Sequence, residues 1–354
     1  MINIAFGCIT AFIITFLAIP SIIKVAIIKN LFDEPGERKA HNSSVPTLGG
    51  LAIFAGVGFS FTFWSSGLGD ETTQYIIAAL IVMFFIGIKD DIIELTAKKK
   101  FYGQLISAVI IVVFAEIRVT NLFGVFGIYE IPYWFSIIFS LFTILTIVNA
   151  FNLIDGIDGL AAGIGAIASF AFGLWFYNYN QISLCILSFT LFSSLIAFLV
   201  YNFSPANIFM GDTGSLIIGL ILAVLAINFI QLSFASPPYA FPFRSSPAMA
   251  IAILIIPLFD TLRIFILRVM QKRSPFKADR NHMHHVLLDM GLSHRGVSLT
   301  LYSVNIIFIM VALLLRDISS LVLLIVLSFM AILFSMAPYL IRLLFKAKPV
   351  DVKI

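Results

Sequence analysis

Long runs of apolar residues alternate with short polar stretches along almost the whole chain. Eleven of these runs are long enough to cross about 30 Å of hydrocarbon as a helix. They cover approximately residues 2–26, 48–67, 74–89, 102–117, 133–149, 159–178, 181–201, 214–232, 247–268, 298–315 and 319–343. The pattern predicts an all-α polytopic membrane protein with about eleven transmembrane helices.

The composition supports this prediction. Of the 354 residues, 60% are hydrophobic and only 11% are charged, whereas soluble domains average about 25% charged residues. The first apolar run lacks a basic region before it and a small-residue cleavage site, so it is expected to be retained as a helix. No internal repeat or low-complexity linker divides the chain, so residues 1–354 are predicted to form one domain, and no nucleic-acid partner is expected.

Positive charge is distributed unevenly between alternate loops. Of the 22 lysines and arginines, all but Arg118, Arg244 and Arg316 fall on one side if each apolar run crosses the membrane once. Because cytosolic loops are enriched in lysine and arginine, this bias predicts an N-terminus outside and a cytosolic C-terminus. The polar motifs, at residues 33–50, 89–104, 149–159, 202–215 and 271–298, then all face the cytosol. The outer segment 118–132 contains short strand-like runs instead.

The most informative motif is residues 149–163, NAFNLIDGIDGLAAG. Asn149, Asn152, Asp155 and Asp158 are three residues apart, which places neighbours on roughly one helical face. Such groups at the end of a membrane span are costly unless they bind something. The alternative is a polar helix end exposed at the membrane interface.

Two further motifs carry acids. Lys89, Asp90 and Asp91 end the third apolar run, and three lysines at 98–100 follow. Adjacent carboxylates need a cation, a proton or basic neighbours, and the lysines can pair with a phosphate. The alternative is a solvated charge cluster that attracts anionic lipid.

The sequence GDTGS places Asp212 at the start of the eighth apolar run. A helix start there supplies backbone N–H groups and a positive dipole end, and the restart at Gly159 does the same for the sixth run. Acids beside two helix N-termini suit a pyrophosphate held with a metal ion, because Mg²⁺ favours one or two protein oxygen ligands plus substrate phosphates. An ordinary helix cap is the alternative.

A histidine cluster, RNHMHH, lies at residues 280–285. Its spacing could indicate zinc, but no cysteine or glutamate accompanies it at the spacing of zinc proteases. Contacts to phosphate or to sugar hydroxyls are favoured, with a capping loop as the alternative. The cluster is expected in a surface loop with few core contacts.

Together the motifs resemble the polyprenyl-phosphate N-acetylhexosamine-1-phosphate transferases, over about residues 38–295. The resemblance rests on RKAH with PTLGG, DDIIELTAKKKFYGQ, NAFNLIDGIDGL, NIFMGDTGSL and RNHMHHVLLDMGLSHR, in that order. HMHH and about eleven spans are closer to the branch that starts O-antigen, enterobacterial common antigen or wall teichoic acid. The phospho-N-acetylmuramoyl-pentapeptide transferases, which usually carry three consecutive histidines there, remain an alternative.

The resemblance implies transfer of sugar-1-phosphate from a UDP-N-acetylhexosamine, by default UDP-GlcNAc, to undecaprenyl phosphate, with release of UMP. It places the protein in the bacterial inner membrane among membrane lipid, with the active site facing the cytosol, and leaves a homodimer open. It implies Mg²⁺, or alternatively Mn²⁺, on Asn152 and Asp212. An ion-coupled transporter is the rival from another class, although transporters place such acids near the midplane of repeated halves.

The resemblance also implies roles for the other site residues. The catalytic residues are Asp90, Asp91 and Lys100, at the lipid phosphate, and Asp155 and Asp158, in the nucleotide pocket. The substrate-binding residues are Lys39, His41, Thr47, Asn149, Asp158 and, toward the sugar, Arg280, His282, His284 and His285.

Overall fold

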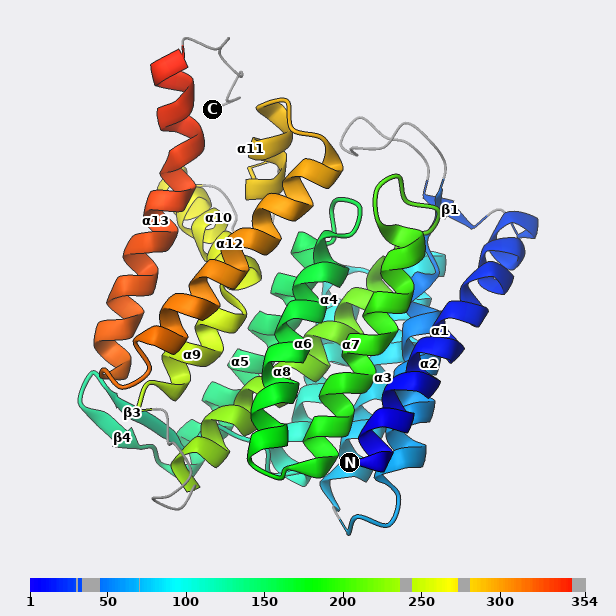
Figure 1. Cartoon of the computed structure of the whole chain (residues 1–354), viewed down its shortest axis with the longest axis horizontal. Helices are drawn as coiled ribbons and strands as arrows, with labels where there is room; N and C mark the ends of the chain where they lie inside the picture. The colour runs from blue at the N-terminus through cyan, green and yellow to red at the C-terminus, as the bar shows by residue number, and fades with distance from the viewer. Residues whose placement is uncertain (30, 34–44, 70, 236–243, 273–280, 346–354) are drawn as a thin grey trace.

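The computed structural model describes residues 1–29, 31–33, 45–69, 71–235, 244–272 and 281–345, and side chains as far as residue 340. Its helices and strands are α1 Ile2–Ile28, β1 Phe32–Asp33, β2 Val45–Pro46, α2 Gly49–Ser65, α3 Thr72–Ile93, α4 Ala97–Val109, the π-helical turn η1 Ile110–Phe114, β3 Asn121–Val125, β4 Ile128–Glu130, α5 Tyr133–Ile154, α6 Leu160–Asn178, α7 Ile182–Asn202, α8 Gly211–Ala235, α9 Ser246–Ile253, α10 Ile255–Met270, α11 Met283–Asp289, α12 His294–Leu314 and α13 Ser320–Phe345 (Figure 1).

The predicted all-α polytopic architecture is confirmed, but the number of eleven spans is not. In the described part of the chain, seven helices are long and apolar enough to cross a membrane: α1, α5, α6, α7, α8, α12 and α13. The run at 247–268 is broken between α9 and α10, which are bent by 86°, and an eighth span results if this pair counts as one. The helix α2 has 17 residues and α4 has 13. Each is shorter than the usual span of about 20 residues.

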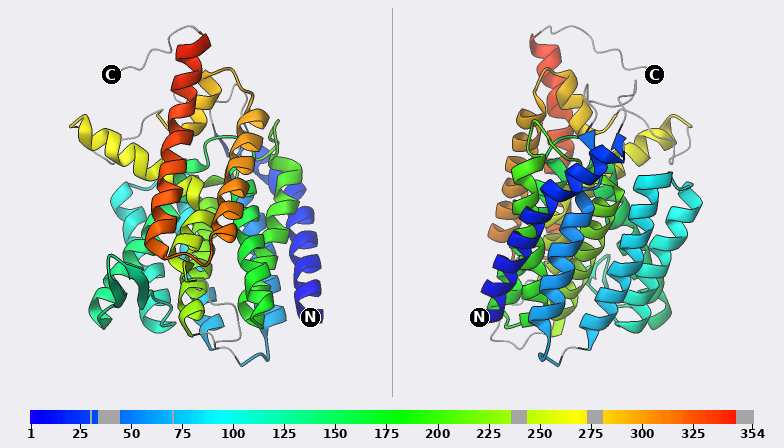
Figure 2. Two further views of the ribbon diagram at one scale, coloured as in Figure 1. Left: turned by 60° about the vertical axis from the view of Figure 1, so that its left-hand side comes forward. Right: turned by 90° about the vertical axis from the view of Figure 1, so that its right-hand side faces the viewer.

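The helix α8 lies in the middle of the bundle, with α2, α3, α5 and α6 packed around it (Figure 2). Glycines allow two of these approaches. A Cβ on Gly87 of α3 would lie 2.4 Å from the Cα of Thr213 at the start of α8, and one on Gly219 of α8 would lie 2.7 Å from the Cα of Val148 of α5. The close approaches bring the C-terminal ends of α3 and α5 beside the N-terminus of α8.

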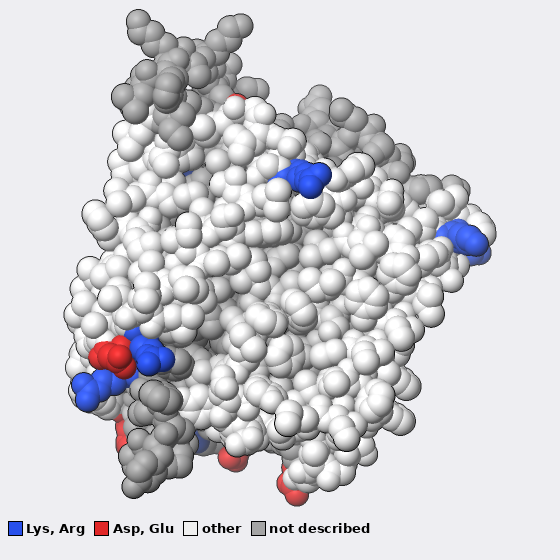
Figure 3. Space-filling view, viewed as in Figure 1, with Lys and Arg blue, Asp and Glu red and all other residues white. Residues whose placement is uncertain are grey.

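The two ends of the molecule differ. The strand-like segment after Arg118 forms the antiparallel hairpin β3–β4, in which Asn121 pairs with Glu130, so that prediction is confirmed. In Figure 1 the hairpin and the N-terminus lie at the lower end, and α11 and the C-terminal end of α13 lie at the upper end. Charged side chains are sparse over the middle of the face drawn in Figure 3 and lie toward its edges. This distribution fits a surface in contact with lipid.

Candidate active site

The candidate site is centred on the ammonium group of Lys100. Its Nζ lies 2.9 Å from Oδ2 of Asp90 and 2.8 Å from Oδ1 of Asp212, and it donates a hydrogen bond to Oδ1 of Asn152 at 3.4 Å. The four side chains come from α4, α3, α8 and α5. The structure therefore joins three motifs that are far apart in the sequence around one positive charge.

Helix geometry explains why Lys100, rather than its neighbours, reaches the centre. Lys98 and Lys99 are exposed, whereas Lys100 and Gln104 are one turn apart on the face of α4 that packs on α5. The carboxamide of Gln104 donates to Oδ1 of Asn149 at 3.4 Å and accepts from Nδ2 of Asn149 at 3.1 Å. The structure thus places Asn149 in a contact between helices, one turn away from Asn152.

Asp91 faces a different neighbour from Asp90. One carboxylate oxygen accepts from the N–H of Asp212 at 2.6 Å, and the other accepts from the N–H of Thr213 at 3.1 Å and from the Thr213 hydroxyl. The side chain therefore satisfies backbone donors that the first turn of a helix leaves free. Asp91 fastens the start of α8, and with it Asp212, to the end of α3.

The start of α8 also packs closely against the segment before α2. Gly211 has φ +71°, and a Cβ there would lie 2.2 Å from the backbone oxygen of Thr47. Glycine is the residue that accepts both the positive φ and the close approach. Thr47 therefore borders the site, whereas Lys39, His41 and Arg280 lie outside the described residues.

Asp155 and Asp158 lie in the turn formed by residues 155–159, between α5 and α6. Burial and the negative charges of Asp212 and Asp91 raise the pKa of the Asp155 carboxyl to about 8. Near neutral pH this carboxyl can therefore hold or release a proton. Asp158 is buried: its Oδ2 accepts from the N–H of Ala206 at 3.1 Å, and its Oδ1 lies 3.5 Å from Nδ1 of His294.

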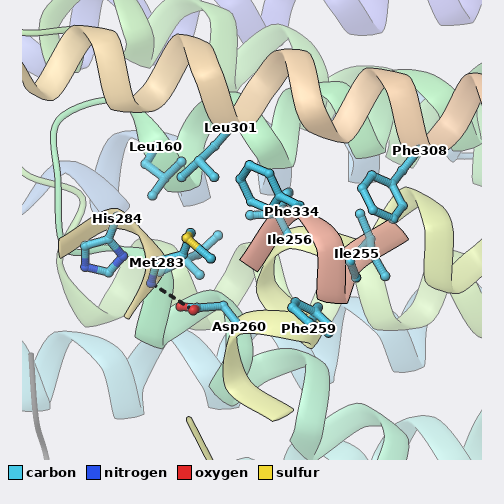
Figure 4. A pocket seen from close by; sticks show the side chains of 12 residues that line it. Leu160, Ile255, Ile256, Phe259, Asp260, Met283, His284, Leu301, Phe308 and Phe334 are labelled. Carbon is cyan, nitrogen blue, oxygen red and sulfur yellow. Dashed lines mark hydrogen bonds between the residues drawn. The ribbon is translucent and has the colours of Figure 1, made fainter. Parts of the chain in front are cut away.

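The expectation that the histidine cluster occupies a surface loop was wrong. His282 and His284 have exposed fractions of 6% and 2%, because they form the start of α11 and pack beneath α12. Asp260 of α10 accepts from Nδ1 of His282 at 2.8 Å. It also accepts from the N–H of Met283 at 2.9 Å, the contact drawn in Figure 4. Because the two imidazoles are buried, water does not solvate them as it would in a surface loop.

His284 nevertheless touches the turn that carries the acids. A Cβ on Gly156 would lie 2.7 Å from Nε2 of His284, so the imidazole lies directly against this glycine. Burial, with a further contribution from His285, lowers the pKa of His284 to about 3. A neutral imidazole fits hydrogen bonds to sugar hydroxyls better than it fits neutralisation of a phosphate charge.

Two residues that hold the site together were missed by the sequence analysis. Asp260 is buried in the apolar run at 247–268, and an ionisable residue inside a membrane segment is itself a signal of function. Asn202 ends α7 and accepts from the N–H of Gly159 at 3.0 Å, while it donates to the carbonyl oxygen of Ile208 at 2.8 Å. Asn202 thereby joins the 155–159 turn to the segment before α8.

The oxygen atoms around Lys100 fit a magnesium ion. Asp212 and Asn152 both direct Oδ1 toward the position of a cation, as the contacts of Lys100 show. Carboxylate and carboxamide oxygens are hard ligands of the kind Mg²⁺ prefers. Within the described residues no three histidine, cysteine, aspartate or glutamate side chains are arranged to hold a metal. The arrangement that fits is therefore a magnesium ion with one or two protein ligands, whose other ligands are substrate phosphates.

Comparison with known proteins supports the assignment from the motifs. The model of glycosyl transferase family 4 matches residues 73–230, which include Asp90, Lys100, Asn152 and Asp212. A probable undecaprenyl-phosphate N-acetylglucosaminyl 1-phosphate transferase of Bacillus subtilis (strain 168) is 34% identical over 327 residues, which cover 90% of this chain and 86% of the relative.

Relatives in other bacteria have similar names. A decaprenyl-phosphate N-acetylglucosaminephosphotransferase of Mycobacterium leprae is 34% identical over 83% of this chain and 79% of its own length. An undecaprenyl-phosphate alpha-N-acetylglucosaminyl 1-phosphate transferase of Salmonella typhi is 30% identical over 77% of this chain and 73% of its own length. The chain therefore belongs to glycosyl transferase family 4, among the polyprenyl-phosphate N-acetylhexosamine-1-phosphate transferases that its motifs resemble.

Proposed function

We propose that this protein transfers N-acetylglucosamine-1-phosphate from UDP-GlcNAc to undecaprenyl phosphate, releasing UMP and starting a lipid-linked glycan of the cell envelope. The observation that carries the proposal is the convergence of Asp90, Asn152 and Asp212 on the ammonium of Lys100. The names of the relatives, which specify a polyprenyl phosphate and N-acetylglucosamine, support the choice of acceptor and sugar.

The reaction is a phosphoryl transfer in one displacement. An oxygen of the acceptor phosphate forms a bond to the phosphorus that carries the sugar. The bond from that phosphorus to the oxygen bridging the two phosphates breaks, and UMP leaves with this oxygen. The second pKa of a phosphate monoester is about 6, so the acceptor is mostly a dianion near neutral pH and needs little help from a base.

The side chains of the protein mainly position the reactants and neutralise their charge, which is what phosphoryl transfer requires of a protein. Lys100 pairs with the acceptor phosphate, Asp90 holds the ammonium in place, and Asp91 fixes the start of α8. Asn152 and Asp212 would hold Mg²⁺, or Mn²⁺, on the diphosphate. When bound there, the metal would neutralise charge that builds up on the leaving phosphate.

Release of UMP tests the proposed function. Purified protein in undecaprenyl-phosphate nanodiscs should release UMP from UDP-GlcNAc, and it should release none when the lipid phosphate is omitted. UDP-GalNAc and UDP-N-acetylmuramoyl-pentapeptide serve as competing donors in the same assay. Turnover of the pentapeptide donor alone would favour the other branch of the family, and no UMP from any donor would contradict the proposal and favour a transporter.

Exchange of labelled UMP into UDP-GlcNAc by protein prepared without lipid phosphate tests the single displacement. A two-step enzyme that forms an aspartyl-phosphate would return labelled UMP into UDP-GlcNAc without any lipid phosphate. The carboxylates of Asp90 and Asp91 are already bound, to Lys100 and to the start of α8, so neither is expected to act as the nucleophile. No exchange is expected from lipid-free protein, and exchange there would refute the mechanism.

Orientation in the membrane is part of the proposal. The lysine and arginine bias supports an outer N-terminus, a cytosolic C-terminus and an active site that faces the cytosol. In Figure 1 the N-terminus and the C-terminal end of α13 lie at opposite ends of the molecule, which agrees with this orientation. Reporter fusions at Thr72 and after Lys353 should report opposite sides of the inner membrane. Two reporters on the same side would overturn the orientation.

A further inference from the structure

We propose that Asp260 is a positioning residue for the transfer, because it ties the first turn of α11 to α10 and so sets His284 against the 155–159 turn. The proposal rests on the proposed function for the reaction that is measured. Asp260 belongs to none of the motifs from which the family resemblance was drawn, and it lies on a different helix from every residue assigned a role in the reaction.

The contacts of Asp260 use both of its carboxylate oxygens. Its Oδ2 accepts from Nδ1 of His282 at 2.8 Å, and its Oδ1 accepts from the N–H of Met283 at 2.9 Å and from the guanidinium of Arg263 at 3.1 Å. An ionised carboxylate only accepts hydrogen bonds, so Nδ1 of His282 carries a proton in this contact. Asp260 thereby fixes both the backbone position and the ring orientation at the start of α11.

The bend between α9 and α10 explains how a residue in an apolar run reaches the histidines. After the 86° bend, Asp260 and Arg263 are three residues apart on one face of α10, and Arg263 also donates to the carbonyl oxygen of Asn281. The two side chains together form a polar seat for residues 281–283. A buried carboxylate is costly without such partners, and Asp260 has an exposed fraction of only 5%.

The pocket beside this seat is mostly apolar. It is lined by twelve residues, of which only Asp260 and His284 are polar. Figure 4 shows apolar side chains of α10, α12 and α13, such as Phe259, Phe308 and Phe334, that line the same pocket as Met283 and His284. Apolar contacts of this kind are not directional, so they do not fix the ring of a histidine as a hydrogen bond does.

Two imidazoles connect Asp260 to the acids of the 155–159 turn. The ring of His284 stacks on that of His282, with centroids 5.5 Å apart and planes 10° apart. Its Nε2 lies against Gly156, next to Asp155. Release of His282 from Asp260 should therefore displace His284 from the turn that lies beside Asp212.

The Asp260→Asn variant tests the proposal. Asparagine keeps the size of the side chain, but its NH₂ group donates, so it opposes the donors that Asp260 accepts from. The rate of UMP release should fall about 10- to 100-fold, the cost typical of removing a side chain that orients another. Because His282 transmits part of the effect, the double variant Asp260→Asn/His282→Ala should lose less activity than the two single losses combined.

Carbethoxylation of histidines by diethyl pyrocarbonate, followed by mass spectrometry, gives a readout that does not need turnover. His282 and His284 are buried and should react slowly in the wild type and several-fold faster in Asp260→Asn. The matched control is Asp289→Asn, the same substitution at an exposed position of α11, which should change neither rate. Gly156→Ala provides a second variant: its Cβ displaces His284 from the opposite side and should lower UMP release while His282 stays protected.

The outcomes separate the two proposals. Wild-type activity and wild-type labelling in Asp260→Asn would overturn the positioning role. So would a loss of activity that is additive with His282→Ala or that leaves the labelling of His282 and His284 unchanged. If Asp260→Asn fails to fold, unchanged UMP release in Gly156→Ala would overturn it. Failure of the wild type to release UMP would refute the proposed function instead, and the labelling comparison would still decide whether Asp260 holds α11.

Discussion

Replacing Asp212 by asparagine is expected to lower the turnover number about 10³-fold, the upper range for removal of one electrostatic contact at a reacting centre. Asparagine has nearly the same shape, so α8 should still start on Asp91, which binds the backbone N–H of this residue. The variant removes the negative charge that faces Lys100 at 2.8 Å and that would hold the metal. The measurement is UMP release from UDP-GlcNAc with undecaprenyl phosphate at saturating Mg²⁺.

Two controls distinguish the loss of activity caused by removing the charge from a loss caused by misfolding or by loss of the metal. Asp317→Asn makes the same change at an exposed aspartate, whose side chain is 87% accessible and pairs with Arg316 at 3.9 Å, and it should keep wild-type activity. The wild type in excess chelator should lose activity and regain it with Mg²⁺ or Mn²⁺. Full activity in chelator would remove the metal from the mechanism, and an active Asp212→Asn variant would remove the carboxylate.

The helical spacing of the 149–163 motif predicted only half of its geometry. The three-residue spacing holds for Asn149 and Asn152, which lie on α5 and point to Gln104 and to the Lys100 cluster. The helix ends at Ile154, and Gly159 has φ +75°, so Asp155 and Asp158 lie in a turn and face different neighbours. The sequence predicted a helix restart at Gly159, but not that α5 ends at Ile154, which leaves both carboxylates off the helical face.

The roles of Asp90 and Asp91 could not be separated from the sequence. Successive residues on a helix point about 100° apart, so at most one of a pair faces a given neighbour. Which neighbour each residue meets depends on the packing of α3 on α8, and that packing depends on the close approach of Gly87 to Thr213. The structure assigns Asp90 to Lys100 and Asp91 to the start of α8.

Hydropathy alone also could not predict the bend within one of the apolar runs, for a physical reason. It records the length of an apolar run but not the direction of the chain within it, and the run at 247–268 turns by 86° at Leu254. The same bend gives Asp260 its place beside His282. The single acid in this apolar run was therefore the signal of a further site residue.

The Lys100→Met variant is expected to lose a similarly large factor, about 10³-fold in kcat/KM for undecaprenyl phosphate. Methionine preserves much of the length of the side chain and removes its charge. Two unit charges about 4 Å apart at an effective dielectric constant of about 20 attract by about 4 kcal/mol, and about 1.4 kcal/mol corresponds to tenfold in rate. Without the ammonium, the carboxylates of Asp90 and Asp212 would also face the acceptor phosphate with no opposing charge.

The neighbouring lysines supply the matched control. Lys98→Met and Lys99→Met make the same substitution in the same turn of α4, at exposed positions, and should change kcat/KM less than twofold. Lys100→Arg should not restore activity, because the oxygens of Asp90, Asn152 and Asp212 converge on a single atom, whereas a guanidinium spreads its donors over a planar fork. If all three Met variants lost activity equally, the lysines would act together as a patch that attracts anionic lipid, and the assignment of Lys100 to the acceptor phosphate would fall.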